Sequence, residues 1–166
     1  SSLINAVCGA RALARVSKTP GKTRACNVYD VDGRWYLVDL PGYGFARASH
    51  ADLADFRQLL RGYVETRERL VGAVWLLDIR RDPSDGDLEM GERFAGRAVP
   101  LLAAITKADK VTRAHRGARV REILKRIGVP EDQAILTSAQ SGEGIPDLRN
   151  SIAALIRRSG GRMVGS

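Results

Sequence analysis

The chain has 166 residues, of which 44% are hydrophobic and 28% are charged. This length fits one domain with its own core, and the composition is that of an ordinary globular protein, which excludes a fibrous or low-complexity chain. No apolar run approaches the length of a membrane span, so we expect no membrane partner. The two cysteines, Cys8 and Cys26, lack metal-ligand spacing and are expected to be reduced thiols of a cytoplasmic protein.

Basic residues exceed acidic ones. Lys and Arg number 27 against 19 Asp and Glu, which gives a formal net charge of +8. One interpretation is solubility alone. The other is a partner rich in RNA phosphate, because the planar Arg guanidinium pairs well with phosphate. Four arginines are crowded around one predicted loop and helix start and are the candidates for that surface: Arg113, Arg116, Arg119 and Arg121.

The first residues predict a short helix. Leu3, Ile4 and Val7 share one face, and Gly9 follows as a C-terminal cap. A phosphate-binding loop of the form G-x-x-x-x-G-K-[ST] normally leads straight into such a helix, and Ser1 would be its last residue. We therefore expect an N-terminal truncation, in which the first strand and the phosphate loop are missing.

A loop and a hairpin are predicted next. Residues 17–23, S-K-T-P-G-K-T, are polar and contain Gly and Pro, which predicts an exposed loop. Residues 27–31 alternate like an edge strand, and Asp32-Gly33 is a two-residue turn signal. Residues 35–38 then return as a core strand.

From residue 53 onward, strands and helices are predicted in alternation. Buried strands are expected at 71–77 and 101–105, and a short last strand at 134–136. Helical stripes are expected at 53–63, 88–95, 120–127 and 148–156. This alternation predicts an α/β protein of three layers, with helices on both faces of a mostly parallel sheet and one antiparallel strand at its edge. The domain is expected to span residues 1–158, followed by a basic, Gly-rich and disordered tail over 159–166.

A candidate base-reading motif, Thr106-Lys107-Ala108-Asp109, follows the strand predicted at 101–105. Open parallel sheets bind ligands at the carboxyl ends of their strands. Guanine presents its N1 hydrogen and its N2 amino group side by side, and the Asp109 carboxylate can accept both. Adenine lacks the N1 hydrogen, so it would leave that carboxylate partly unpaired. Lys107 can lay its methylene stem along the base, while the Thr106 hydroxyl can brace the loop.

A second turn, Thr137-Ser138-Ala139, follows the last predicted strand. We expect its backbone N–H groups to donate to the guanine carbonyl oxygen. A solvated charged turn is the plain alternative for residues 106–109. That alternative loses weight because the second turn lies at the neighbouring strand end.

Asp39-Leu40-Pro41-Gly42 is suited to the phosphate end of a nucleotide. Asp39 can hold a magnesium-bound water, and the Gly42 N–H can bond the γ-phosphate. Thr23 lies upstream in a Gly-containing loop, where a switch threonine would ligate magnesium. Ser1 would supply a second hydroxyl ligand, the alternative being a helix N-cap. Together, and in this order, the two motifs indicate a GTPase.

Tyr43 follows Gly42, at the position where other GTPases carry the Gln that orients the attacking water. A tyrosine has no amide for that task. We therefore expect slow hydrolysis that depends on another residue, on a monovalent cation such as K⁺, or on a partner.

These strings resemble those of the YihA/EngB (YsxC-like) family of bacterial GTPases, and the resemblance spans almost the whole chain. The matching strings are S-S-L-I-N at 1–5, S-K-T-P-G-K-T at 17–23, D-L-P-G-Y-G-F-A at 39–46, L-D-I-R at 77–80 and T-K-A-D-K at 106–110. The most specific of them are T-P-G-K-T and D-L-P-G-Y-G-F-A.

The resemblance implies a P-loop NTPase G domain that binds and hydrolyses GTP. It implies a monomeric switch that assists assembly of the large ribosomal subunit, with rRNA and ribosomal proteins as partners, and that is needed for normal cell division and septation. It assigns Mg²⁺ to Ser1 and Thr23, and catalytic roles to Thr23, Asp39 and Gly42. The nucleotide-binding residues it implies are Ser1, Ser2, Gly21, Lys22, Thr23, Arg24, Ala25, Asp39, Leu40, Pro41, Gly42, Thr106, Lys107, Ala108, Asp109, Thr137, Ser138 and Ala139.

Two alternatives stay open. The chain could be a non-enzymatic basic module that binds the ribosome or RNA and has lost nucleotide chemistry. It could also be a related GTPase of the Era or Der type. Those carry an extra RNA-binding or second GTPase domain, for which we expect no room after Arg158.

Overall fold

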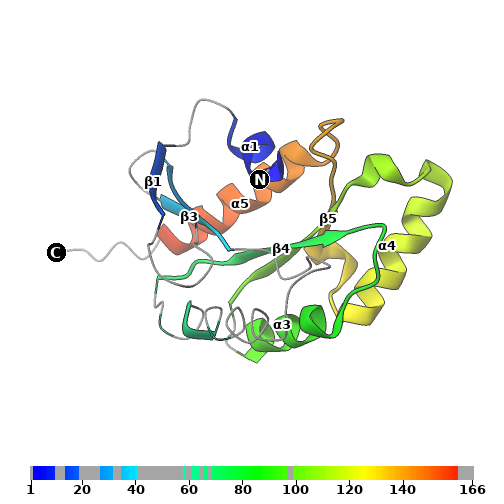
Figure 1. Cartoon of the computed structure of the whole chain (residues 1–166), viewed down its shortest axis with the longest axis horizontal. Helices are drawn as coiled ribbons and strands as arrows, with labels where there is room; N and C mark the ends of the chain where they lie inside the picture. Colours follow the sequence, from blue (N-terminus) through cyan, green and yellow to red (C-terminus); the bar gives the residue numbers. More distant parts are fainter. Residues whose placement is uncertain are drawn as a thin grey trace. The chain divides into compact units, whose positions relative to one another are not determined.

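The computed structural model describes residues 2–9, 14–18, 27–31, 35–40, 58, 61–63, 66, 69–96 and 99–160 (Figure 1). They belong to two compact units. The first comprises Ser1 and Cys8–Arg69, and the second comprises Ser2–Val7 and Leu70–Ser166.

The first unit contains an antiparallel sheet of three strands in the order β1-β2-β3. Strand β2 (Asn27–Val31) pairs with β3 (Trp35–Asp39), with Tyr29 opposite Leu37. The predicted pairing of these two strands is therefore confirmed, but β2 is the central strand of this sheet, so the edge position predicted for residues 27–31 is wrong. The turn predicted at 32–33 lies outside the described residues.

Strand β1 (Ala14–Lys18) is an element that the sequence pattern missed, and the predicted loop at 17–23 is wrong for its first two residues. Ser17 pairs with Val28 and Lys18 with Asn27, and the register shifts between Arg15 and Ser17. Such an irregularity breaks the alternation of a strand, so pairing with β2, rather than local pattern, makes this segment extended. Residues 19–23 lie outside the described residues.

The predicted helical stripe at 53–63 is described only in part. Gln58, residues 61–63 and Thr66 are helical. The Thr66 hydroxyl donates to the Gly62 carbonyl at 2.6 Å, which is the i−4 bond typical of a helical threonine. Leu53, Phe56 and Leu60 lie outside the described residues.

The second unit contains a parallel sheet of three strands, which confirms the three strands predicted for this part of the chain. Strands β4 (Ala73–Asp78), β5 (Leu101–Thr106) and β6 (Ala134–Leu136) are adjacent in this order. Asp78 is opposite Thr106, and Ile105 is opposite Leu136. The carboxyl ends of all three strands therefore meet at one edge.

Helices cover both faces of this sheet, as predicted. Helices α1 (Ser2–Cys8) and α5 (Ile145–Gly160) lie on one face, and α3 (Asp85–Gly96) and α4 (Arg113–Ile127) lie on the other (Figure 1). The core under the first pair consists of Leu3, Ala104, Ile145 and Leu148, with partly buried aliphatic side chains around them. On the other face, the Trp75 ring lies so close to α3 that a Cβ at Gly91 would be 3.1 Å from it.

The helix ends differ from the sequence prediction in two places. Helix α4 begins at Arg113, after Thr112 in extended conformation, well before the apolar face predicted to start at residue 120. Helix α5 continues through Ser159 and Gly160, which were expected in the disordered tail. A helix propagates cheaply past its last apolar residue, because each added residue forms another backbone bond. Residues 161–166 lie outside the described residues.

Among the helices described, none is both long and apolar enough to cross a bilayer.

Gly144 lies between β6 and α5 and has a φ of +68°, and a Cβ there would overlap the Leu136 carbonyl oxygen. We expect Gly144→Ala to lower the free energy of unfolding by several kcal/mol, because alanine there combines a strained left-handed backbone with a Cβ that overlaps the Leu136 carbonyl oxygen. Gly142 is a matched control with a φ of +81° and open space around a Cβ. Gly142→Ala should cost only the left-handed backbone strain, about 1–2 kcal/mol. Urea denaturation followed by circular dichroism measures both, and equal losses would contradict this packing.

Candidate guanine-nucleotide site

The predicted base-reading residues lie at the carboxyl edge of the second unit's sheet. Thr106 ends β5, and its hydroxyl donates to the Leu77 carbonyl of β4 at 3.1 Å. A short 3₁₀ helix, η1 (Ala108–Lys110), follows directly. Lys107 joins the two with φ 62° and ψ 37°, and it is the one non-Gly residue with a positive φ in the described part of the chain. Such a conformation is uncommon for a side-chain-bearing residue, so packing around this turn must hold it in place.

Backbone hydrogen bonds join the turn after β5 to the turn after β6. The Thr137 N–H donates to the Ile105 carbonyl at 2.7 Å, and the Ala108 N–H donates to the Thr137 carbonyl at 3.1 Å. Ala108, Thr137 and Ser138 are all fully buried. The two predicted turns therefore form one rigid unit.

The Asp109 carboxylate is held from two sides. Its Oδ1 accepts a hydrogen bond from the Ser138 hydroxyl at 2.6 Å, and its Oδ2 lies 3.1 Å from the Lys110 ammonium. The Ser138 hydrogen bond, together with Lys110, lowers the pKa of Asp109 below its usual value. Asp109 is therefore ionised at neutral pH and oriented before any ligand arrives.

The predicted backbone donors of the second turn are reduced to one. The Thr137 N–H is bonded to Ile105, and the Ser138 N–H donates to the Glu143 carbonyl at 2.9 Å, so the prediction is wrong for these two groups. The Ala139 N–H has no acceptor within the described residues, and Ala139 is exposed. It is therefore the N–H of this turn that a carbonyl oxygen of a ligand can reach.

The role of the Ser138 side chain is one that sequence reasoning missed. Its hydroxyl donates to Asp109 and also accepts from the Ser141 N–H at 3.1 Å. Ser138 and Asp109 are 29 residues apart. No spacing rule in the sequence joins them, and only the adjacency of β5 and β6 brings them together.

Two of the four arginines predicted to face phosphate are engaged within the protein. Arg116 bonds the Glu143 carboxylate at 2.8 Å and the Val111 carbonyl at 2.8 Å, so it joins the start of α4 to the loop before α5. Arg119 contacts Asp82 and Glu122 at 2.7 Å each. Hydrogen bonding to Glu122, and then to Asp82, raises the pKa of Arg119. Arg113 and Arg121 are exposed.

The residues expected at the phosphate end are described only in part. Ser2 lies in α1, and Leu40 follows Asp39 at the end of β3 in the first unit. The Asp39 carboxylate accepts a long hydrogen bond of 3.4 Å from the Asn27 side chain. Within the described residues no three His, Cys, Asp or Glu side chains form a metal-binding group. The other predicted residues of this end lie outside the described residues: Ser1, Gly21, Lys22, Thr23, Arg24, Ala25, Pro41, Gly42 and Tyr43.

A fixed carboxylate at the strand ends of a parallel α/β sheet, with an accessible N–H beside it, is typical of a GTPase. A family model described as "50S ribosome-binding GTPase" matches residues 1–107. A crystal structure of a probable GTP-binding protein EngB is similar to this chain with a TM-score of 0.75, covering 95% of this chain and 92% of that one at 19% identity. The chain therefore has the P-loop GTPase fold.

Two curated relatives narrow this class to one family. The probable GTP-binding protein EngB of Syntrophomonas wolfei is 41% identical over 156 residues, which cover 94% of this chain and 80% of the relative. The probable GTP-binding protein EngB of Gemmatimonas aurantiaca is 44% identical over 156 residues, covering 94% of this chain and 76% of the relative. The chain belongs to the EngB family of GTP-binding proteins, as the resemblance of its motifs predicted.

The hydrogen bond from Ser138 can be tested without a ligand. We expect Ser138→Ala to raise the pKa of Asp109 toward its ordinary value, because the largest influence that lowers it is removed. Carboxyl ¹³C chemical shifts followed through a pH titration measure this. Ser141→Ala is the control, since that hydroxyl contacts the Glu143 N–H and not Asp109. An unchanged Asp109 pKa in Ser138→Ala would show that this hydrogen bond does not form.

Proposed function

We propose that this chain binds GTP and GDP and hydrolyses GTP as a conformational switch. The observation that supports this proposal most is the Asp109 carboxylate, which is ionised and accepts a hydrogen bond from the Ser138 hydroxyl of the neighbouring turn. Its two oxygens can accept the N1 and N2 hydrogens of guanine, and the Ala139 N–H can donate to the guanine carbonyl oxygen. Adenine has an acceptor at N1 and a donor at C6, so it would leave the Asp109 carboxylate and the Ala139 N–H without these partners.

At the phosphate end, Ser1 and Thr23 would hold Mg²⁺, and Asp39 would contact it through water. These oxygen donors fit the preference of that ion. The Asp39 carboxylate can accept further hydrogen bonds, since within the described residues it accepts only the long one from the Asn27 side chain. The ion, when bound, would neutralise charge on the phosphates. Thr23 and Gly42 would contact the γ-phosphate, so their loops would become ordered with GTP and be released with GDP. Tyr43 in place of a glutamine makes unaided hydrolysis slow, with K⁺ or a partner as the accelerating factor.

Base selectivity tests this proposal. In Asp109→Asn, the amide replaces an acceptor by a donor, so it mismatches guanine and matches xanthine, which has a carbonyl at that position. We expect GTP affinity to fall by several kcal/mol and XTP to become the preferred ligand. Isothermal titration of both nucleotides, with GDP and XDP in parallel, measures the change.

Asp132→Asn serves as the control, because Asp132 is an exposed carboxylate on the 3₁₀ helix η2 (Glu131–Gln133) and faces no part of the proposed site. It should bind GTP as the unaltered chain does. An Asp109→Asn variant that retains its GTP preference would exclude Asp109 from base recognition.

We further propose the large ribosomal subunit as the partner, with a cytoplasmic, monomeric protein whose loss disturbs cell division and septation. The family description names ribosome binding, and the net charge of +8 suits an RNA-rich surface. After Arg116 and Arg119 are set aside, exposed basic side chains remain along α4: Arg113, Arg121, Lys125 and Arg126. Contacts of this kind are with phosphate and shape rather than with base edges.

Sedimentation with large subunits across a salt series tests the partner. Binding should weaken steeply as salt rises, and it should be tighter with a non-hydrolysable GTP analogue than with GDP. The double variant Arg121→Ala/Lys125→Ala should bind more weakly than the charge-matched control Arg157→Ala/Arg158→Ala on α5. Binding that ignores both salt and nucleotide would favour the non-enzymatic module instead.

A further inference from the structure

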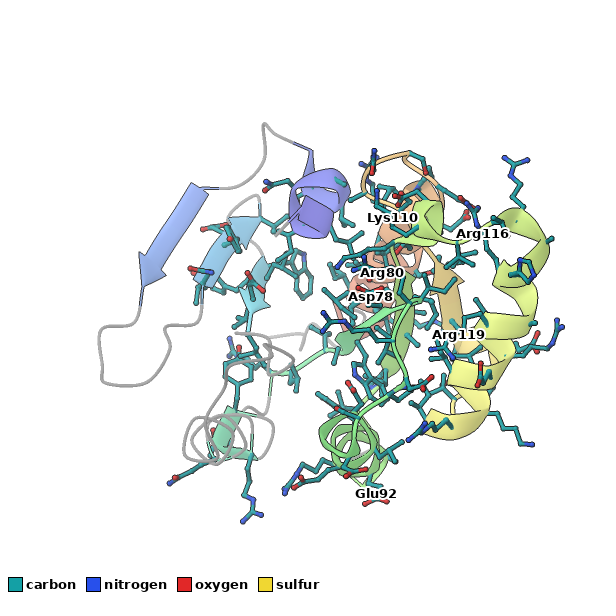
Figure 2. The ribbon with its side chains drawn as sticks, turned by 45° about the vertical axis from the view of Figure 1, so that its right-hand side comes forward. Asp78, Arg80, Glu92, Lys110, Arg116 and Arg119 are labelled. Carbon is teal, nitrogen blue, oxygen red and sulfur yellow. The ribbon has the colours of Figure 1, made fainter. Side chains whose placement is uncertain are left out.

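At the carboxyl end of β4, the Asp78 carboxylate contacts two cations, Arg80 and Lys107. Figure 2 shows Asp78 and Arg80 side by side. Asp78 Oδ1 accepts from the Arg80 N–H and from Arg80 Nε, each at 3.0 Å. Asp78 Oδ2 accepts from Arg80 Nη2 and from Lys107 Nζ, each at 2.8 Å. Lys107 therefore reaches back from β5 to its neighbouring strand, and the contact joins residues 29 positions apart.

The backbone that carries Asp78 is fixed on both sides. The next residue, Ile79, is fully buried, and its N–H donates to the Thr106 carbonyl at 3.1 Å. The Ile79 carbonyl accepts from Arg119 Nε of helix α4 at 2.9 Å. Asp78 is thus attached to β5 and to α4 through its neighbour, and its carboxylate is a rigid anchor.

Asp78 keeps its charge at any pH at which the protein is used. The hydrogen bond from Arg80 is the largest influence that holds the pKa of Asp78 far below its usual value, and Lys107 adds to it. The same contact raises the pKa of Arg80. One carboxylate therefore holds two cations, and a neutral amide at this position could not hold the ammonium of Lys107 in the same way.

The Lys107 side chain is fixed at its tip and open along its length. Its ammonium is bound to Asp78, yet the side chain remains 52% exposed. Its backbone is in the left-handed conformation at the start of η1, one residue before the buried Ala108. Anchored at both ends, the four-carbon stem of Lys107, two residues before Asp109 in the chain, is a preformed apolar strip, and little rotamer freedom is left for a ligand to remove.

We infer that Asp78 is a positioning residue for guanine-nucleotide binding: it holds the ammonium of Lys107 so that the lysine stem forms a fixed surface for the base. The inference rests on the proposed function, because it needs Asp109 to bind the edge of the guanine base while the lysine stem lies along the face of that base. Arg80 completes the anchor by occupying the remaining acceptor positions of Asp78.

A double-mutant cycle on the full chain tests this. GDP affinity is measured by titration of amide resonances for Asp78→Asn, Lys107→Ala and the two combined. We expect Asp78→Asn to weaken GDP binding by about fivefold to tenfold, and the combined variant to bind no more weakly than Lys107→Ala alone, since both changes remove one interaction. Asp82→Asn is the control: this exposed carboxylate pairs with Arg119 and not with Lys107, so its GDP affinity should stay within about twofold.

Lys107→Met covers the case in which Asp78→Asn loses its fold, since it leaves the Asp78–Arg80 pair intact. It keeps an apolar stem without the ammonium, and we expect GDP binding to weaken by about the same factor as in Asp78→Asn. Additive losses in the cycle, or unaltered GDP affinity in Lys107→Met, would overturn the positioning role. An unaltered chain that binds GDP no better than Asp109→Asn does would instead contradict the proposed function, and this inference with it.

Discussion

The parallel pairing of β4, β5 and β6 is the constraint on which the rest of the second unit depends. Because the three strands run in one direction, the polar residues that follow them meet at a single edge. The pairing continues past the strands through backbone bonds from Thr137 to Ile105 and from Ala108 to Thr137. Without that continuation, the two turns would be independent loops and Asp109 would lose the Ser138 hydroxyl that orients it.

Polar groups at this edge are buried only where they are paired. Thr137 and Ser138 have no exposed surface, and no buried side-chain nitrogen or oxygen in the described part of the chain lacks a partner. Burial in a low-dielectric setting makes an unpaired polar group costly and a paired one rigid. The site is therefore preorganised, because the same hydrogen bonds that satisfy the interior also orient the groups left open to a ligand.

The arginine excess has two separate roles in this protein. Arg80 forms an ion pair with Asp78, two residues away at the end of β4. Arg116 and Arg119 pair with Glu143 and Asp82, and each joins α4 to a loop that the chain connectivity alone would leave independent. Arg113 and Arg121 are exposed on α4 and form no such ion pair with the described residues. A net charge read from the sequence counts both groups equally, but only exposed, unpaired cations are suited to a phosphate-rich surface.

The sequence by itself determined the features that depend on local pattern. Apolar runs defined the three parallel strands, the turn signal at 32–33 defined the hairpin, and Gly9 marked the end of α1. The motif at 106–109 and the turn at 137–139 could be recognised as a pair, because each directly follows a strand. These features are short-range, and backbone conformation and hydrophobic periodicity are encoded within a few residues.

Only the tertiary structure decided which atoms of those motifs are available. It assigned the Ser138 hydroxyl to Asp109, occupied the Thr137 and Ser138 N–H groups, and left that of Ala139 open. It also showed β1, whose irregular register hides its alternation, and the contact of Lys107 with Asp78. These outcomes join residues far apart in the chain, and the sequence could not reveal them because they depend on which strands lie side by side and on which hydrogen bonds are already used.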